Sequence, residues 1–146
     1  MTTRLGIDAG DARIGVAINQ GSLCLPIETL QTSENSAKEI SHIATSRAVE
    51  AVYVGLPLSL SGGLTLSSHK AISLAKRIQE QGLTVRMIDE RLTTKSAQAR
   101  FHQAGKNTKK SKGQIDSAAA AIILEFAIAS EKDGNLAGKT LEEIHE

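Results

Sequence analysis

Cysteine, proline and aromatic residues are scarce in this chain. Its 146 residues include one cysteine, two prolines, one tyrosine, two phenylalanines and no tryptophan. The single cysteine, Cys24, excludes an internal disulfide and fits a reducing compartment, which we expect to be the cytoplasm. With 2% aromatic residues, the core must be built from aliphatic side chains, and a platform that stacks on nucleic-acid bases is not expected.

The sequence also lacks a hydrophobic run long enough to cross a bilayer, and its first residues carry no apolar signal segment. We therefore expect no membrane association. The net charge of +1 excludes a strongly basic protein, so any surface that binds polyanions must be local. The length and the 40% hydrophobic content predict one compact domain over residues 1–130, followed by a polar tail at 131–146.

Hydrophobic patterning predicts an α/β fold with a mixed sheet. Pro26 places its strand at an edge, because proline cannot donate to a central ladder. Helices are expected to cover the faces of the sheet. The polar tail is expected to fray, with a short helix near Leu141. The predicted strands cover residues 5–7, 14–18, 23–30, 51–57 and 84–88, and the predicted helices cover about 36–44, 71–78, 93–104 and 115–129.

Three acidic residues stand where apolar segments stop. Asp8 closes the first strand, Glu90 follows the fifth strand, and Asp116 opens the last helix. A carboxylate near the core is costly unless a cation or hydrogen-bond donors compensate it. Three of them at the ends of strands and helices therefore indicate a shared site for divalent metal. The alternatives are a turn residue for Asp8 and a helix-start acid for Asp116.

Alternation along the fifth strand leaves Asp89 and Glu90 both open as the metal ligand. Adjacent residues of a strand point to opposite faces, so the two cannot easily reach one site. If Met87 faces the core, Asp89 shares its side, and alternation alone slightly favours Asp89 over Glu90.

Basic residues stand close to these acids in the sequence. Residues 106–113 contain four lysines and no acid, which predicts a mobile loop that contacts phosphate beside the acidic site. Arg13, in or just after the first turn, and Arg91, next to Glu90, are further candidates for clamping phosphate or orienting carboxylates. A solvated surface without a special role is the alternative for both arginines. The four lysines are Lys106, Lys109, Lys110 and Lys112.

Short motifs in a fixed order resemble the YqgF family, which is associated with Holliday junction resolution and with maturation of the small-subunit rRNA precursor. The motifs are GIDAG at 6–10 with RIGVA at 13–17, VGLP at 54–57, DERLTT at 89–94, and DS at 116–117. The resemblance spans roughly residues 5–125 and implies a ribonuclease-H-like fold, here a mixed five-stranded sheet flanked by helices.

The same resemblance implies a nuclease whose catalytic, metal-binding carboxylates are Asp8, Glu90 and Asp116, and it thereby selects Glu90 over Asp89. The implied cofactor is Mg²⁺ or Mn²⁺. The implied substrate is structured RNA, such as the 5′ end of pre-16S rRNA, or branched DNA, such as a Holliday junction. The residues do not choose between RNA and DNA, or between a monomer and a homodimer.

Two other functions stay open at this point. The segment 6–17 also resembles the phosphate-binding hairpin of the actin and sugar-kinase group, which suggests a small ATP-binding protein. Those proteins close two such domains over the nucleotide, and this chain has room for one. The second alternative is a non-catalytic nucleic-acid-binding module, which the presence of all three carboxylates disfavours.

Overall fold

The computed structural model describes residues 2–93 and 112–145, with only the backbone described at 112–116. Five strands in this part of the chain form one mixed sheet in the order β3-β2-β1-β4-β5. β1 pairs antiparallel with β2, and β2 with β3, whereas β1, β4 and β5 run parallel. This confirms the predicted five-stranded mixed sheet. The strands are β1 (Arg4–Ala9), β2 (Arg13–Gln20), β3 (Leu23–Gln31), β4 (Ala51–Leu56) and β5 (Val85–Asp89).

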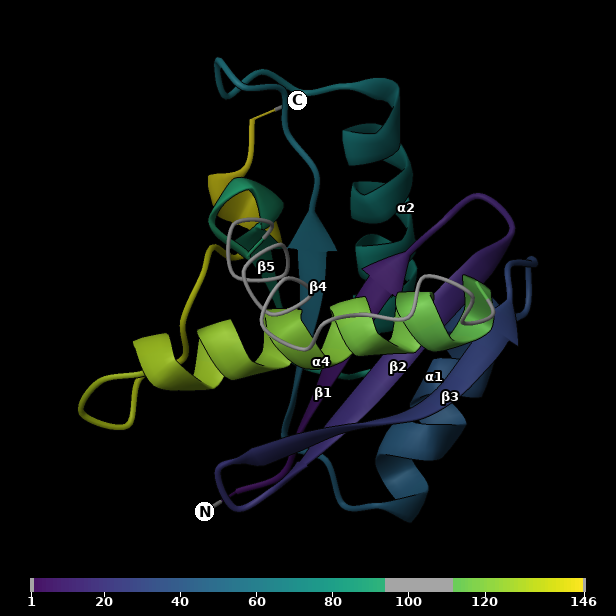
Figure 1. Cartoon of the computed structure of the whole chain (residues 1–146), viewed down its shortest axis with the longest axis vertical. Helices are drawn as coiled ribbons and strands as arrows, with labels where there is room; N and C mark the ends of the chain where they lie inside the picture. Colours follow the sequence, from purple (N-terminus) through teal and green to yellow (C-terminus); the bar gives the residue numbers. More distant parts are fainter. Residues whose placement is uncertain (1, 94–111, 146) are drawn as a thin grey trace, which may run out of the picture.

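Helices cover both faces of the sheet. α1 (Ser36–Ser46) and α2 (Leu66–Glu80) pack on one face, and α4 (Lys112–Ser130) crosses the other (Figure 1). Each face has its own aliphatic core, so the strands are buried on both sides, as the near-continuous apolar run of β4 predicts. None of the helices in the described part of the chain is long and apolar enough to span a membrane.

Residues of β1 alternate between the two cores. Leu5 and Ile7 point to the face covered by α1 and α2. Gly6 points to α4, which approaches so closely that a Cβ atom on Gly6 would lie 2.5 Å from the carbonyl oxygen of Ala120. Asp8, two residues after Gly6, therefore belongs to the α4 face.

β3 lies at the edge, as Pro26 predicts. The register between β2 and β3 shifts between Val16 and Ala17, where Ala17 is opposite Pro26 and Val16 is opposite Glu28. Such a bulge interrupts the ladder of an edge strand. Cys24, two residues before Pro26, is buried and is not in a disulfide, in agreement with its interpretation as a small hydrophobic residue.

The C-terminal tail docks on the sheet, which corrects the expectation that it frays. Lys139 forms an antiparallel bridge with Met87 of β5, with N···O distances of 2.8 and 3.0 Å. The buried Tyr53 hydroxyl donates to the carboxylate of Glu131 and accepts from the backbone N–H of Ala137 at 3.0 Å. These buried partners fix a segment that looks polar in the sequence.

Two helices begin earlier than predicted. The chain is helical from Glu90, directly after β5, instead of from Thr93. The rest of that predicted helix lies outside the described residues, as do Lys106, Lys109 and Lys110 of the predicted basic loop. α4 begins at Lys112 instead of residue 115, so it includes a glycine that the basic-loop prediction had placed outside it. The cost of one helical glycine, about 1 kcal/mol, is small beside the burial of the apolar helix. The predicted short helix forms at Leu141–Glu143.

Candidate active site

Asp8 and Glu90 come together at one edge of the sheet. The carboxyl ends of the parallel strands β1 and β5 lie at this edge, and both strands flank β4. Ile88 packs in the core on the α4 face, so Glu90, two residues later and just past the strand, continues to that face. Asp8 belongs to the same face. The fold thus brings together two acids that are 82 positions apart (90 − 8) in the sequence.

A glycine leaves room for the carboxylate of Glu90. A Cβ atom on Gly55 would lie 3.0 Å from both Cγ and Cδ of Glu90 and 2.7 Å from Cδ1 of Ile123 in α4. The Glu90 side chain therefore lies directly over β4, between the sheet and α4. On the other side of β1, the residue opposite Asp8 in the ladder is Gly15. Gly15 belongs to the RIGVA motif and Gly55 to the VGLP motif, and at Gly55 the absence of a side chain leaves space for Glu90.

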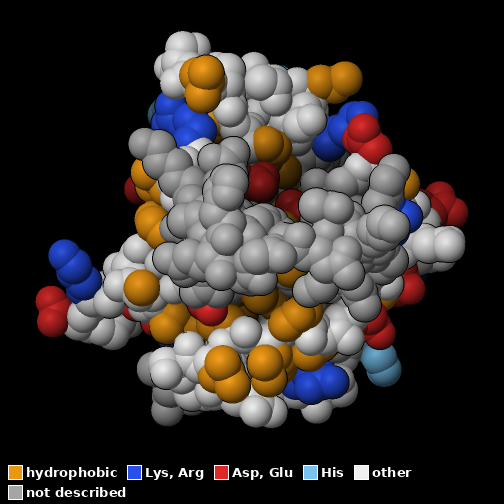
Figure 2. Space-filling view, viewed as in Figure 1, with side chains coloured by type: hydrophobic (Ala, Val, Ile, Leu, Met, Phe, Trp, Pro, Cys, Tyr) orange, Lys and Arg blue, Asp and Glu red, His pale blue; other side chains and the backbone are white. Residues whose placement is uncertain are grey.

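The environment of Glu90 favours its protonated form. Burial, followed by the negative charges of Asp8 and Asp89, raises the pKa of Glu90 to about 7 from its ordinary 4.5. Figure 2 looks onto the face that α4 covers, and acidic side-chain atoms lie in a recess near its middle. Two carboxylates held this close favour a cation between them.

Asp89 belongs to a different set of contacts. It shares the side of Met87, as alternation predicts, and this is the face opposite the one that carries Asp8 and Glu90, because both faces of the sheet are core. Its carboxylate accepts from the Arg91 guanidinium, with the shortest contact 2.6 Å, and from the Arg91 backbone N–H at 2.9 Å. These hydrogen bonds lower the pKa of Asp89.

Arg91 also contacts the loop that contains Leu60 and Gly62. Its Nη1 donates to the carbonyl of Leu60 at 3.3 Å, and the guanidinium lies beside Gly62, where a Cβ atom would be 3.2 Å from Nη1. Arg91 is thus engaged with Asp89 and the loop, and it orients Asp89 rather than Glu90. Arg13 begins β2 and is half-buried, on the same strand face as Gly15 and hence on the side of Asp8. Phosphate contact by either arginine stays a prediction.

Asp116 lies on α4, four residues after the helix begins and one turn before Ala120. Ala120 is the residue that contacts Gly6 of β1, so the backbone of α4 near Asp116 is held on the face that carries Asp8. The side chains of Asp116 and Lys112 lie outside the description. Among the side chains that are described, no group of three or more His, Cys, Asp or Glu converges. The triad as a whole therefore stays a prediction.

The raised pKa of Glu90 makes a prediction about stability. Folded Glu90 holds its proton up to about pH 7, whereas the unfolded chain releases it near 4.5. Without metal, its contribution is fully present below pH 4.5 and is lost as the pH rises through about 7, at a cost of about 3 kcal/mol. Urea unfolding in EDTA at acidic and alkaline pH should show this loss, and Glu90→Gln should abolish it. The exposed Glu80→Gln is the control, and equal pH dependence in all three proteins would refute the interpretation.

A family model described as "RuvX: Holliday junction resolvase" matches residues 2–130. The chain belongs to the RuvX family. This confirms the family resemblance that the motifs predict. A protein of Leifsonia xyli subsp. xyli (strain CTCB07) is 43% identical over 134 residues, covering 88% of this chain and 86% of its own. One of Corynebacterium jeikeium (strain K411) is 40% identical over 128 residues, covering 84% and 83%. Both are named "Putative pre-16S rRNA nuclease".

Among solved structures, "T. thermophilus RuvC in complex with Holliday junction substrate" aligns with a TM-score of 0.58 at 15% identity, covering 88% of this RuvX-family chain and 96% of RuvC. At this identity the likeness shows the fold alone, and it confirms the ribonuclease-H-like prediction. The family and its relatives support a hydrolase that acts on nucleic-acid esters.

Proposed function

We propose that this RuvX-family protein is a divalent-metal-dependent nuclease that processes pre-16S rRNA. The observation that carries the proposal is the convergence of Asp8 and Glu90 at one edge of the sheet, with the buried Glu90 side chain over Gly55 and its pKa raised to about 7. Two neighbouring carboxylates in a recess are destabilising by themselves and become favourable when a cation joins them. The choice of RNA rests on the names of the curated relatives, which cover most of this chain.

The donor set fits Mg²⁺ or Mn²⁺. Carboxylate oxygens are the ligands that these hard cations prefer, and Gly55 leaves room for the Glu90 side chain on the face that also carries Asp8. Asp8, Glu90 and Asp116 would hold the metal. When bound, it would activate water and stabilise the leaving oxygen of a phosphodiester.

The protein's own residues position the reacting groups. β1 and β5 fix two carboxylates on rigid strand ends, and α4, packed on Gly6, carries the third. Arg91 holds Asp89 through four hydrogen bonds, so this neighbouring acid is neutralised and does not compete for the cation. Arg13, on the face of Asp8, and the lysines 106, 109, 110 and 112 are proposed to draw the phosphate backbone toward the acidic site.

The substrate choice is tested by direct competition between RNA and DNA. The full chain is incubated with a 5′-extended pre-16S rRNA fragment and with a four-way DNA junction, each with Mg²⁺, Mn²⁺ or EDTA. We expect metal-dependent shortening of the rRNA fragment and little cleavage of the junction. Cleavage of the junction alone would replace the rRNA assignment with resolution of branched DNA, for which the family description provides the precedent.

Other outcomes of the same assay would favour the other functions. Tight binding to either nucleic acid without metal-dependent cleavage would indicate a non-catalytic binding module. Tight binding of ATP with no affinity for nucleic acid would indicate the ATP-binding alternative. The family match over residues 2–130 favours the nuclease over both.

A further inference from the structure

A cavity lined mainly by polar residues lies on the opposite face of the sheet from Glu90. Its volume is about 390 Å³, and it is bounded by the turn between β1 and β2, the segment leading into α1, and one side of α2. Ala9 and Gly10 line it, and they directly follow Asp8 in the chain. Since neighbouring residues of a strand point to opposite faces, the cavity and the acidic site share one edge of the sheet.

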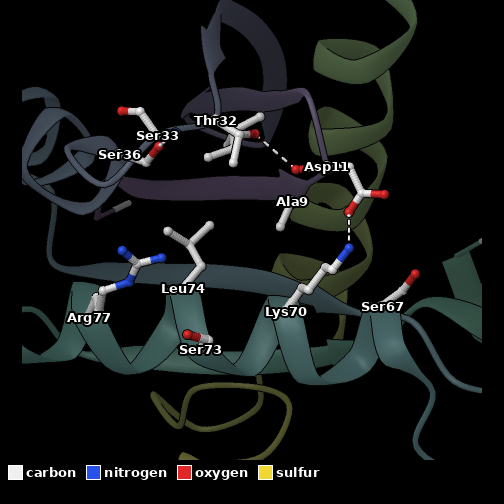
Figure 3. Close-up of a pocket in the computed structure, with 12 residues that line it drawn as sticks. Ala9, Asp11, Thr32, Ser33, Ser36, Ser67, Lys70, Ser73, Leu74 and Arg77 are labelled. Carbon is white, nitrogen blue, oxygen red and sulfur yellow. Dashed lines mark hydrogen bonds and ion pairs between the residues drawn. The ribbon is translucent and has the colours of Figure 1, made fainter.

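Two cations line this cavity from α2. Lys70 and Arg77 are seven residues apart, which separates their Cα atoms by about 10 Å along the helix axis. Figure 3 shows both side chains rising from the same side of α2, Lys70 toward Asp11 and Arg77 toward the segment that carries Ser33 and Ser36. Two cations in a row suit an extended polyanion better than a single small anion.

Neither cation is held in a buried ion pair. Lys70 Nζ contacts Asp11 Oδ1 at 2.8 Å, but both side chains are more than half exposed, at 53% and 76%. Exposed pairs of this kind contribute little and exchange readily for another anion. Within the described part of the chain, the contacts include no ion pair or hydrogen bond of Arg77, so its charge is available to a ligand.

Hydroxyl groups complete the lining. Ser36 is 1% exposed, and its Oγ accepts a hydrogen bond from the backbone N–H of Ser33 at 2.8 Å. Its own hydroxyl hydrogen has no acceptor among the hydrogen bonds of the described residues, so it can donate to an anion in the cavity. Ser67 and Ser73 of α2 add further donors, and no aromatic residue lines the cavity. This chemistry recognises phosphate oxygens and offers nothing that stacks on a base.

We propose that this cavity binds successive phosphates of the nucleic-acid strand that crosses the sheet edge at Asp8, with Arg77 and Lys70 as its contacts. This rests on the proposed function for the identity of the polymer. The nucleic-acid strand would pass from the acidic site on the α4 face over the β1–β2 turn to α2. The phosphates on one side of the cleavage site would then be bound on the opposite face of the sheet. The cavity would make no contact with the bases, so recognition would depend on the position of the sugar-phosphate backbone.

The test measures binding separately from cleavage. Fluorescence anisotropy in EDTA, where no cleavage occurs, gives the affinity of the full chain for a short RNA duplex with a single-stranded extension, over a range of salt concentrations. Arg77→Gln should weaken binding about 3–10-fold and reduce the slope of log K against log salt by nearly one. Asp11→Asn, which frees Lys70 from its partner, should tighten binding about 2–5-fold. Both variants must show wild-type unfolding curves.

Lys76→Gln is the matched control, because it makes the same charge change on the residue of α2 just before Arg77, outside the cavity lining. Its affinity should stay within twofold of wild type. Equal losses in Arg77→Gln and Lys76→Gln would mean a diffuse charge effect and would overturn the proposal. No change in Arg77→Gln would overturn it as well.

A second measurement distinguishes a polymer from a small phosphate compound. Inorganic phosphate and a nucleoside diphosphate are titrated into the isotope-labelled protein, and the amide signals of Gly10, Ser33 and Ser36 are followed by NMR. Shifts that depend on Arg77, combined with unchanged RNA affinity in Arg77→Gln, would assign the cavity to a small phosphorylated ligand and refute the proposal. The proposed nuclease activity is judged independently, because it depends on Asp8 and on metal, whereas this cavity is judged by binding in EDTA.

Discussion

Asp8→Asn is expected to abolish metal-dependent cleavage while leaving the protein folded. The substitution keeps the size of the side chain but removes one of the two charges that converge on the α4 face. Loss of a preorganised charge at the reacting phosphate costs at least about 10²–10³-fold in rate. The measurement is the initial rate of cleavage of the preferred substrate, at saturating Mg²⁺ and again with Mn²⁺.

Measurements of stability show whether Asp8→Asn loses cleavage without losing its fold. Asp8 is one of the charges that raise the pKa of Glu90, so its neutralisation relieves repulsion in the metal-free protein. Asp8→Asn should therefore be at least as stable as wild type above pH 7 in EDTA, and less stabilised than wild type by added Mg²⁺. Asp133→Asn makes the same chemical change at an exposed position of the C-terminal tail, outside the acidic site and the cavity beside α2, and should cleave at the wild-type rate. Full activity in Asp8→Asn would remove Asp8 from the metal site.

Gly6→Ala is expected to destabilise the protein by about 3 kcal/mol. The new Cβ atom would lie 2.5 Å from the carbonyl oxygen of Ala120 and 2.8 Å from Cβ of Leu124. Both are atoms of α4 that cannot move aside without moving the helix, so β1 and α4 must separate. In a chain of this size, the loss corresponds to a decrease in the midpoint of thermal unfolding of about 6–12 °C.

The same substitution should impair cleavage, because α4 carries Asp116 and its approach to β1 is set at Gly6. Gly63→Ala is a suitable comparison. Its Cβ atom would meet only the hydroxyl oxygen of Ser59, at 3.3 Å, on an exposed loop. Unfolding in urea should show a change below about 1 kcal/mol for Gly63→Ala. Similar stabilities for the two variants would mean that α4 tolerates displacement, contrary to the close packing of this face.

The fold could be predicted from the sequence largely because its signals are local. The edge position of β3 follows from Pro26, and the burial of β4 on both faces follows from its unbroken apolar run. The docking of residues 131–145 could not be predicted, because it depends on Tyr53, more than seventy residues earlier, accepting and donating hydrogen bonds beneath the tail. A polar segment gives no local indication of a distant buried partner.

The acidic site was only partly predictable. Positions at the ends of strands pointed to Asp8 and Glu90, but alternation slightly favoured Asp89, because it took the side of Met87 as the side of the acidic site. With helices on both faces, the side opposite Met87 is equally enclosed, and Glu90 lies there. The motif glycine Gly55 was a usable signal, since a strand position without a side chain leaves space for the side chain of a neighbouring acid, here Glu90.

The cavity beside α2 was not predicted at all, although the sequence contains a signal for it. Ser67, Lys70, Leu74 and Arg77 recur at intervals of three and four, which places them on one stripe of the helix. Cations on a helix are ordinarily assigned to solvent. Only the fold shows that this stripe faces the β1–β2 turn and the segment before α1.

The bridge between Lys139 and Met87 has a consequence for self-association. The sheets of two molecules can pair when an edge strand of each exposes backbone N–H and C=O groups that have no partner. Here the C-terminal tail pairs with part of the edge strand β5, and a bulge next to Pro26 interrupts the other edge strand, β3. A pair of subunits that merged their sheets across β5 would first have to expel Lys139, which disfavours both a continuous ten-stranded assembly and uncontrolled fibril growth from that margin.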